Sequence, residues 1–378
     1  MSHSLDARLN EELRHWGQQG RRRTLTSARG VDFTTNDYFS LSCHPEVIQA
    51  SQEAAEKFGA GAGAARLLRG NLDLHETLEN ETAQWQNTEA ALLLPSGYQA
   101  NLALLSTLPN AGDILLSDER NHASIIDGCR LSKATCAIYQ HNNLTSLREQ
   151  YSRWKKTADA DAHAWVVTER VFSMNGTLAP IADIFDFAEK ENAFVLLDEA
   201  HAAGVYPALP ANPRCVAKVI TGGKALGVCG ALLCISQAIK NILLHRGRSF
   251  VFTTAPSPAT TGALLKSIQL IQKNPQWSDE VLAKAQSLRK HLQSIPIPVG
   301  GEGAILKVQL GDEQTAVAFA GALQQRGFDV RAVRPPTVPE GESQLRIVCH
   351  KNHSEEQFLA LAEAMKHVQK TFAHATLS

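Results

Sequence analysis

Short apolar runs that alternate with amphipathic segments constrain the fold of this chain more than any other feature. Each run holds four or five residues and is apolar nearly throughout, as strands buried on both faces of a sheet are. The runs are ALLL (91–94), DILLS (113–117), AWVVT (164–168), FVLLD (194–198), KVIT (218–221) and ALLCI (231–235). The alternation predicts an α/β fold: a parallel sheet with helices on both faces, which binds ligands at the carboxyl ends of its strands.

The pattern changes at both ends of the chain. After about residue 260, two long amphipathic segments precede shorter strand-like and helix-like pieces, which predict a smaller α+β domain. The first 40 residues contain a helix-like stretch, the cluster RRR and an extended piece. We therefore expect an N-terminal arm over 1–40, a large domain over 41–259 and a small C-terminal domain over 260–378.

Charge and hydropathy exclude several partners. The 37 basic and 38 acidic residues leave a formal charge of -1, so no overall charge argues for nucleic acid or an anionic membrane. No apolar run approaches the roughly 20 residues that span a bilayer, and the N-terminus is polar without a signal-peptide core. These features predict a cytoplasmic protein.

The seven cysteines are scattered and include no CxxC pair. In a reducing compartment they predict small buried apolar side chains rather than a disulfide framework or a zinc site, and we expect no metal.

Polar residues follow the apolar runs where a parallel sheet places its ligands. Ser96 and Gly97 join a run to a helix-like segment, whose N-terminus offers free N–H groups and a positive dipole end to a phosphate. An ordinary turn would look the same. Asp198, Glu199 and His201 end another run, and a buried carboxylate needs a cationic partner such as a protonated ring nitrogen. The letters DEAH also suit a nucleotide-hydrolysing strand, but the required GxxxxGK[ST] loop is missing.

Lys224 stands in the glycine-rich stretch ITGGKALGVCGA, directly after a strand-like run. By itself it would be an ordinary solvated charge. Together with a phosphate seat and a buried acid, it completes the set that pyridoxal phosphate requires: an amine for the aldehyde, an acid for the ring nitrogen and an anion site. The small neighbours of Lys224 would let a flat ring approach closely, and Thr221 adds a hydroxyl.

The order and spacing of several segments resemble the α-oxoamine synthases from about residue 5 to residue 370. The matching segments are TNDY (35–38), SGYQAN (96–101), NHAS (121–124), TERVFSMNGTLAPI (168–181), DEAHAAGV (198–205), TGGKALGVCGA (221–231) and RPPTVPEGESQLRI (334–347). The resemblance implies a pyridoxal-phosphate enzyme of the aspartate-aminotransferase fold (fold type I), with a large, mostly parallel sheet domain.

The resemblance also implies roles for individual residues. Lys224, His122 and Asp198 would be catalytic: the lysine would bond the cofactor and move a proton, the imidazole would stack on the ring, and the carboxylate would pair with the ring nitrogen. The other implied cofactor contacts are Gly97, Tyr98, Ser173, His201, Thr221 and, from a neighbouring subunit, Thr254. The implied substrate contacts are Arg21, Asn36, His122, Thr337 and Arg346, with Arg346 binding the amino-acid carboxylate.

Taken one by one, these residues also have ordinary interpretations. His122 could cap a helix, Ser173 could be a turn hydroxyl, and Arg346 could pair with an acid on an exposed strand. Only their joint spacing favours the catalytic interpretation.

The RRR arm and the RPPTVP stretch look most like the family member that condenses L-alanine with a pimeloyl thioester, carried by acyl carrier protein or CoA, in biotin biosynthesis. The family also implies a homodimer. Three alternatives stay open: a sister enzyme that uses glycine with an acetyl thioester or serine with a long acyl chain, a plain aminotransferase, and a non-catalytic scaffolding subunit.

The sequence departs from the family pattern around the expected acyl pocket. Arg170 replaces a usual glycine, Ala202 and Ala203 follow DEAH, and Phe39 and Ser40 replace a usual Leu-Gly pair. The segment between His201 and Lys224 is shorter than usual, and within it YPALPANPRC (206–215) replaces the usual glycine-rich GxxGRG piece. These changes are expected to affect acyl specificity more than cofactor chemistry.

Overall fold

The computed structural model describes residues 4–375 and divides into two compact units. The large unit contains Asn36–Phe172 and Leu178–Asp279, and the small unit contains Met1–Thr35, Ser173–Thr177 and Glu280–Ser378. The later division falls inside helix α11 (Gln276–Gln293). The sequence-based boundaries at residues 40 and 259 stay a prediction.

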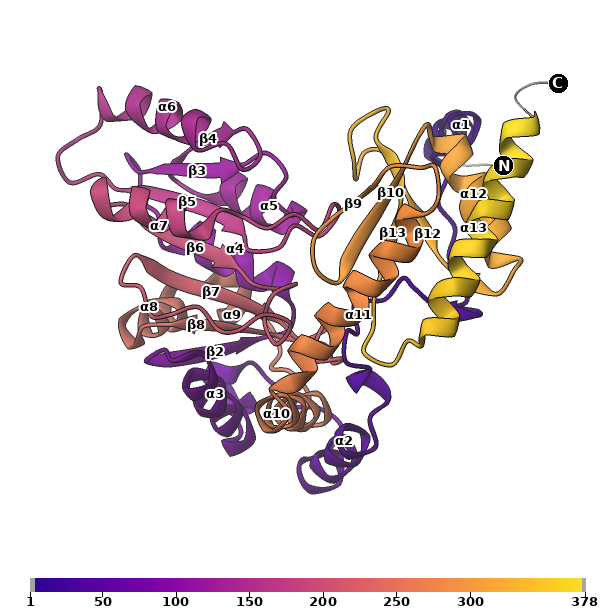
Figure 1. The fold of residues 1–378 in the computed structure, drawn as a ribbon. Coiled ribbons are helices and arrows are strands. Elements are labelled where there is room, and N and C mark those ends of the chain that lie inside the picture. Colours follow the sequence, from indigo (N-terminus) through magenta and orange to yellow (C-terminus); the bar gives the residue numbers. More distant parts are fainter. Residues whose placement is uncertain (1–3, 376–378) are drawn as a thin grey trace. The chain divides into compact units, whose positions relative to one another are not determined.

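A seven-stranded sheet forms the centre of the large unit, in the order β2-β8-β7-β6-β5-β3-β4 (Figure 1). Its strands are β2 (Ala90–Leu94), β3 (Ile114–Asp118), β4 (Thr135–Tyr139), β5 (Ala164–Glu169), β6 (Phe194–Asp198), β7 (Cys215–Thr221) and β8 (Ala231–Ile235). Strand β8 runs antiparallel to β2 and to β7, while the other pairs are parallel. The sheet is therefore mostly parallel, as the resemblance implies.

Strand β8 is the one exception to the parallel direction within this sheet, for a clear reason. A crossover between parallel strands needs about a dozen residues or more, whereas β7 and β8 are joined only by residues 222–230. Strand β4 was missed altogether, although CAIY (136–139) is a continuous apolar run; it is an edge strand and partly exposed.

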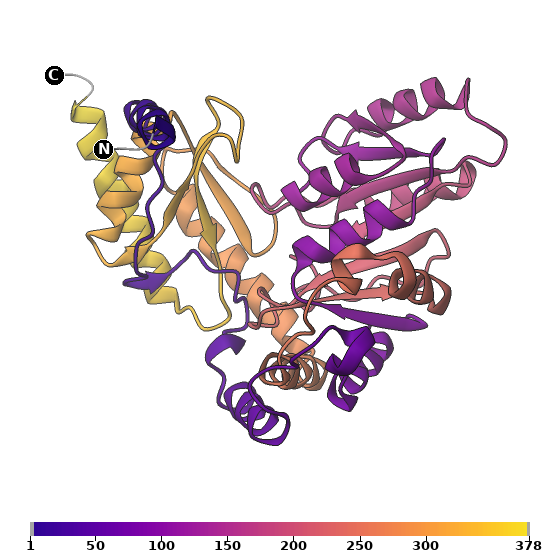
Figure 2. The ribbon, with the colours of Figure 1, turned by 180° about the vertical axis from the view of Figure 1, so that it is seen from behind.

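Helices cover both faces of this sheet, as the ribbon shows from the front and from behind (Figures 1 and 2). One apolar cluster joins the sheet to α4, α5, α8 and α9, and a second joins its other face to α6 and α7. The helices of the large unit are α2 (Pro45–Phe58), α3 (Asp73–Gln86), α4 (Gly97–Thr107), α5 (Ala123–Leu131), α6 (Leu144–Lys155), α7 (Ile181–Lys190), α8 (Gln237–Arg246), α9 (Arg248–Val251) and α10 (Pro258–Lys273). A short 3₁₀ turn (Leu41–Cys43) and a π turn (Arg66–Gly70) complete it.

Side-chain caps fix where several of these helices begin. In each case a side-chain oxygen accepts a backbone N–H of the first turn, which satisfies a group that the helix cannot pair internally. The capping residues are Ser96, Asn143, Ser236 and Ser257.

The small unit is an α+β structure with its own apolar core. Its antiparallel sheet has the order β12-β13-β10-β9 and packs against helices of the same unit. The strands are β9 (Val299–Gly300), β10 (Ile305–Gly311), β12 (Arg331–Val333) and β13 (Ser343–Val348), and a separate parallel pair joins β1 (Val31–Asp32) to β11 (Phe328–Asp329). The helices are α1 (Ser4–Gln18), α12 (Glu313–Gln324), α13 (Glu355–Ala375) and most of α11.

Within residues 4–375, every helix is too short or too polar to cross a lipid bilayer.

The expectation that the cysteines are buried was partly wrong. Cys129, Cys234 and Cys349 are buried, but Cys43, Cys136 and Cys229 are exposed. Cys136 is exposed because it lies on the edge strand β4.

Candidate active site

Strand direction gathers the predicted residues of the large unit at one edge of the seven-stranded sheet. Strand β8 is antiparallel to both of its neighbours, so β2 runs parallel to β7 and to the rest. The carboxyl ends of β2, β3, β6 and β7 therefore share an edge. Gly97 follows β2, His122 follows β3, Asp198 ends β6, and Lys224 follows β7.

The N-terminus of α4 lies against the end of β7. Ser96 caps the helix by accepting the N–H of Gln99 at 3.2 Å. A Cβ atom added to Gly97 would lie only 2.5 Å from Thr221 Oγ1, so the absence of a side chain lets the hydroxyl reach the helix terminus. Free N–H groups, a positive dipole end and a hydroxyl together form a cradle that suits a phosphate group.

A buried hydrogen-bond chain orients Asp198. Its Oδ2 accepts from Asn101 Nδ2 at 2.8 Å, and its Oδ1 accepts from the N–H of Ala200 at 2.9 Å. Asn101 Nδ2 also lies 2.9 Å from Ser124 Oγ, which lies 2.8 Å from His122 Nδ1. The carboxylate is only 7% exposed. The chain thus links the acid to the imidazole through two neutral side chains.

The imidazole of His122 is held in its neutral form. Burial lowers the pKa of His122, the charge of Lys224 lowers it further, and Asp198 partly opposes both. Lys224 and Asp198 therefore both lie within electrostatic range of this ring. Tyr98 contacts the ring edge-on, with centroids 6.3 Å apart. A neutral, supported imidazole is a suitable surface for stacking a flat ligand.

His201 is fixed by a residue from an earlier part of the chain. Tyr38 OH lies 2.7 Å from His201 Nδ1, and both side chains are buried. The contact sets the orientation of the imidazole.

The glycines beside Lys224 serve the loop's own packing. A Cβ on Gly222 would come within 2.3 Å of the Val228 carbonyl oxygen, and one on Gly227 within 2.4 Å of the Ser42 nitrogen. Gly227 also has φ +65°, which favours glycine. Gly223 has no such neighbour within 4 Å. Packing within the protein therefore accounts for Gly222 and Gly227. Gly223 stays a candidate position for close approach of a ligand.

Two predicted residues of the small unit lie together. Arg346 is buried on β13, and its Nε donates to the Ser173 carbonyl oxygen at 2.6 Å. The structure therefore contradicts the interpretation of Arg346 as an exposed surface partner. Its role toward an amino-acid carboxylate stays a prediction.

The predicted acyl-side residues of the same unit form a polar cluster. Arg21 binds Glu313 and Glu340, each at 2.8 Å. Thr337 Oγ1 accepts from Arg23 at 3.0 Å, so the RRR stretch is only partly solvated.

Two further predicted residues belong to the large unit. Asn36 is half-buried, and its carbonyl oxygen accepts the N–H of Tyr38 at 2.9 Å. Thr254 is exposed in the connection between α9 and α10. An exposed position suits a contact with another subunit but does not test it.

Arg170, one of the departures from the family pattern, anchors the shortened segment after His201. Its guanidinium lies 3.4 Å from Glu199 Oε2, donates to the Pro207 carbonyl oxygen at 3.0 Å and lies over the ring of Tyr206. Burial raises the pKa of Glu199, although Arg170 opposes this. The arginine therefore ties residues 206 and 207 to the end of β6.

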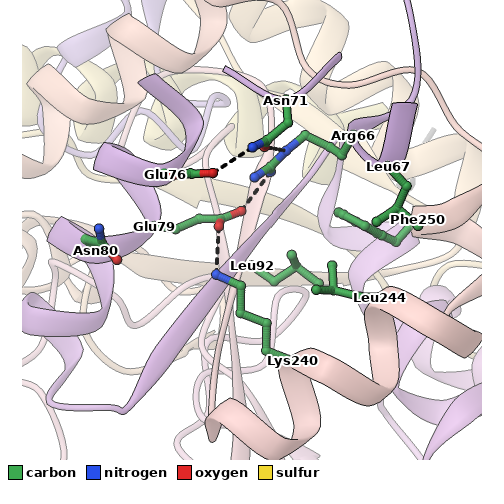
Figure 3. A pocket seen from close by; sticks show the side chains of 10 residues that line it. All are labelled: Arg66, Leu67, Asn71, Glu76, Glu79, Asn80, Leu92, Lys240, Leu244 and Phe250. Atoms are coloured by element: carbon green, nitrogen blue, oxygen red, sulfur yellow. Dashed lines mark hydrogen bonds and ion pairs between the residues drawn. The ribbon is translucent and has the colours of Figure 1, made fainter. Parts of the chain in front are cut away.

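A separate cavity of about 280 Å³ lies between α3, α8 and the π turn (Figure 3). Glu79 is its buried hub: it accepts from Arg66 at 2.7 Å, Lys240 at 2.8 Å and the Leu93 N–H at 2.9 Å. Glu76 also lines the cavity, so two acids face two cations, and Glu79 anchors β2, the strand that leads into the α4 cradle. None of the predicted site residues lines this cavity.

Sequence reasoning missed the supporting residues Asn101, Ser124 and Tyr38. Each stands in a segment that resembles the family (SGYQAN, NHAS and TNDY), which was the available signal. Their roles depend on contacts between elements far apart in the sequence, so no local pattern predicts them.

Comparisons with known proteins agree with this geometry. The sequence profile of the family described as aminotransferase class I and II matches residues 28–365. An 8-amino-7-oxononanoate synthase of Methylobacterium nodulans is 39% identical over 377 residues, which cover 96% of each chain. One of Dechloromonas aromatica is 38% identical and covers 92% of each chain.

Solved structures of similar proteins agree with the sequence comparisons. Serine palmitoyltransferase from S. paucimobilis with bound PLP-myriocin aldimine has a TM-score of 0.89 at 26% identity, over 98% of this chain and 99% of that one. The 8-amino-7-oxononanoate synthase of Francisella tularensis has a TM-score of 0.77 at 26% identity, over 91% and 99%.

Proposed function

Because the chain belongs to the class I and II aminotransferase family, and within it to the α-oxoamine synthases, we propose that it is an 8-amino-7-oxononanoate synthase. It condenses L-alanine with a pimeloyl thioester and releases the thiol and carbon dioxide, a step of biotin biosynthesis. The observation that carries the chemistry is the convergence of Lys224, Asp198, His122 and the α4 N-terminus at one sheet edge. The choice of family member rests on relatives of that name across nearly the whole chain.

The cofactor is pyridoxal phosphate, and the residues of the large unit fit it. When bound, it supplies an electron sink that stabilises negative charge on the Cα atom of an amino acid. The α4 N–H groups and Thr221 bind the phosphate, with Gly97 and Tyr98 beside it. Thr254 of the partner subunit adds a hydroxyl in a homodimer.

Asp198 and His122 set the electronic state of the ring. Asp198 is held by two donors, and its carboxylate would hold the ring nitrogen of the cofactor and favour the protonated form, because a nearby anion favours the charged form. His122 stacks on the ring as a neutral imidazole. His201 would hold the phenolic oxygen, and the resemblance implies the same role for Ser173.

Lys224 does the proton chemistry. Its amine would hold the cofactor at the aldehyde carbon, and with alanine bound it would take the Cα proton of the substrate as general base. The Cα carbon forms a bond to the thioester carbonyl carbon, and the thiol leaves. The carboxylate then departs as carbon dioxide, and Lys224 returns a proton to the same carbon.

The small unit supplies the substrate contacts. Arg346 would bind the alanine carboxylate by charge-assisted hydrogen bonds. The resemblance implies Asn36 as a further contact. Arg21 and Thr337 lie on the acyl side. Acyl carrier protein and CoA are both compatible with these residues as thioester carriers.

A product assay tests this function. The purified protein with pyridoxal phosphate is offered alanine, glycine or serine together with pimeloyl, acetyl or palmitoyl thioesters, and products are identified by mass. We expect 8-amino-7-oxononanoate from alanine and a pimeloyl thioester, and none with Lys224→Ala. A preference for another pair, or formation of a keto acid with a second amino donor, would contradict the proposal.

One sister activity has its own support. The serine palmitoyltransferase structure has the higher TM-score of the two compared above, 0.89 against 0.77. The serine and palmitoyl arm of the assay therefore tests the second candidate directly. A scaffolding subunit is disfavoured because Lys224 is present.

A further inference from the structure

An aspartate and a histidine that the proposed chemistry does not use form a pair at the edge of the seven-stranded sheet. Asp118 ends β3, and His141 lies just beyond the end of β4, the parallel strand beside it. His141 Nδ1 lies 2.9 Å from Asp118 Oδ1, and the aspartate side chain is fully buried. Because a carboxylate oxygen accepts, the imidazole donates from Nδ1. The pair therefore lies at the same edge of the sheet as His122.

Asp118 holds the turn that leads to His122. Its Oδ1 also accepts the N–H of Arg120 at 2.9 Å, and its backbone carbonyl oxygen accepts the N–H of Asn121 at 3.1 Å. These two residues stand directly before His122, which is the N-cap residue of α5. The orientation of the Asp118 carboxylate thus helps to set the backbone from which the His122 ring projects.

The same pair also contacts the segments that follow β4 and β5. Asp118 Oδ2 accepts the N–H of Asn142 at 2.9 Å, and Asn142 Nδ2 donates to the Leu178 carbonyl oxygen at 2.9 Å. The His141 ring meets the Phe172 ring edge-on, with centroids 4.4 Å apart. A side chain with a hydrogen bond on one side and an aromatic contact on another has little freedom to reorient.

We propose that His141 is a positioning residue for the cofactor site: its N–H holds the Asp118 carboxylate, and Asp118 fixes the turn from which His122 stacks on the cofactor ring. His141 acts through Asp118 and does not itself touch the cofactor. A stacking ring must be held within narrow limits of distance and angle, so a residue that supports it affects binding without contact. This role rests on the cofactor site proposed above, and not on the choice of amino acid or acyl donor.

Two substitutions separate the hydrogen bond of His141 from its aromatic contact. His141→Asn keeps a side-chain N–H near the position of Nδ1 but lacks the ring, whereas His141→Leu keeps an apolar side chain beside Phe172 but lacks the donor. Each apoprotein is titrated with pyridoxal phosphate, and the circular dichroism of the bound cofactor is recorded. We expect His141→Leu to raise the Kd roughly fivefold and to change the spectrum. His141→Asn should stay close to the wild type in both measurements.

His163 provides a matched control on the same sheet. It is also half-buried and lies beside an aromatic ring, that of Phe194, with centroids 5.1 Å apart. It directly precedes β5, so it lies at the opposite, amino-end edge of the sheet. His163→Leu should therefore leave the Kd and the spectrum of the cofactor unchanged.

A double-mutant cycle shows whether His141 acts through His122. In a His122→Ala background, His141→Leu should have no further effect on the Kd. Asp118→Asn leaves the imidazole in place and weakens the same hydrogen bond, so it should also raise the Kd, and it decides the question should His141→Leu not fold.

An unchanged Kd and spectrum in His141→Leu or in Asp118→Asn would overturn the proposal, even if the free energy of unfolding fell, because the pair would then serve only stability. Additive effects of His141→Leu and His122→Ala on the Kd would overturn it as well. Both readouts follow the cofactor alone, so a different pair of substrates in the product assay would leave this result intact.

Discussion

Asp198 depends on Asn101 for its orientation, although Asn101 has no proposed contact with the cofactor or the substrates. The amide bridges Asp198 Oδ2 and Ser124 Oγ inside the large unit. A carboxylate that must pair with a ring nitrogen gains from such a fixed neighbour, because an unpaired donor or acceptor in the interior is costly.

Asn101→Ala should therefore weaken cofactor binding. Losing one hydrogen bond to a charged group costs about 1.4 kcal/mol, which corresponds to a roughly tenfold higher Kd. The Kd is measured by titrating the apoprotein with pyridoxal phosphate. Ser106→Ala, on the same helix, removes only a bond to the Leu102 carbonyl oxygen and is the control. An unchanged Kd in Asn101→Ala would show that Asn101 is not needed to orient Asp198 for cofactor binding.

His353 should make the stability of the small unit depend on pH. It stacks on Phe33 at 4.2 Å, its Nδ1 accepts the His350 N–H at 3.0 Å, and its Nε2 lies 2.7 Å from the Asp32 carbonyl oxygen. Burial, with His350 and Lys284 nearby, lowers the pKa of His353 to about 4, while Asp32 opposes the shift. The ring is thus neutral and donates from Nε2.

A lowered pKa in the folded state means that the unfolded chain binds more protons between about pH 6.5 and pH 4. Stability should therefore fall as the pH drops through this window, by about 2 kcal/mol between pH 7 and pH 5. Urea unfolding at both values tests this. His353→Gln should show a smaller loss between pH 7 and pH 5, whereas the exposed His367→Gln should match the wild type. Equal pH dependence in all three proteins would contradict the assignment.

At the scale of elements, α4 and the end of β7 are in close contact at the proposed phosphate site. Gly97→Ala would place a Cβ atom 2.5 Å from Thr221 Oγ1, so one of the two elements must move. Overpacking of this kind costs about 1–3 kcal/mol.

A double-mutant cycle isolates that contact. Gly97→Ala should lower the free energy of unfolding of the apoprotein, and the loss should largely disappear in a Thr221→Ala background, where the hydroxyl is missing. Gly223→Ala, which has no neighbour within 4 Å, is the control for adding a methyl group nearby. Additive effects of Gly97→Ala and Thr221→Ala would mean that the two residues do not constrain each other.

The elements also show what the sequence can and cannot predict. The buried strands were predictable from the spacing of apolar residues in the sequence. The polar residues of the site were predictable because they directly follow those strands. The direction of β8 was predictable from the short connection around Lys224 but was missed. The Asn101 bridge and the Tyr38–His201 contact were not predictable, because they join elements that only the fold brings together.

At the scale of the whole molecule, the proposed homodimer makes Thr254 of the partner subunit part of each site. Lys224→Ala and Thr254→Glu should each be inactive, the second because a carboxylate repels the phosphate. Mixing the two proteins under conditions of subunit exchange should restore about a quarter of wild-type activity, since half of the dimers are mixed and each has one intact site. If Thr254 acted within its own subunit, the mixture would stay inactive.

The central claim is that Lys224 carries the cofactor, and one measurement tests it most directly. The protein is incubated with pyridoxal phosphate, reduced with borohydride and digested, and the peptide that carries the added pyridoxyl group is sequenced by mass spectrometry. The account predicts a yellow protein and a single modified residue, Lys224. A colourless protein, or a pyridoxyl group on a different lysine, would contradict it.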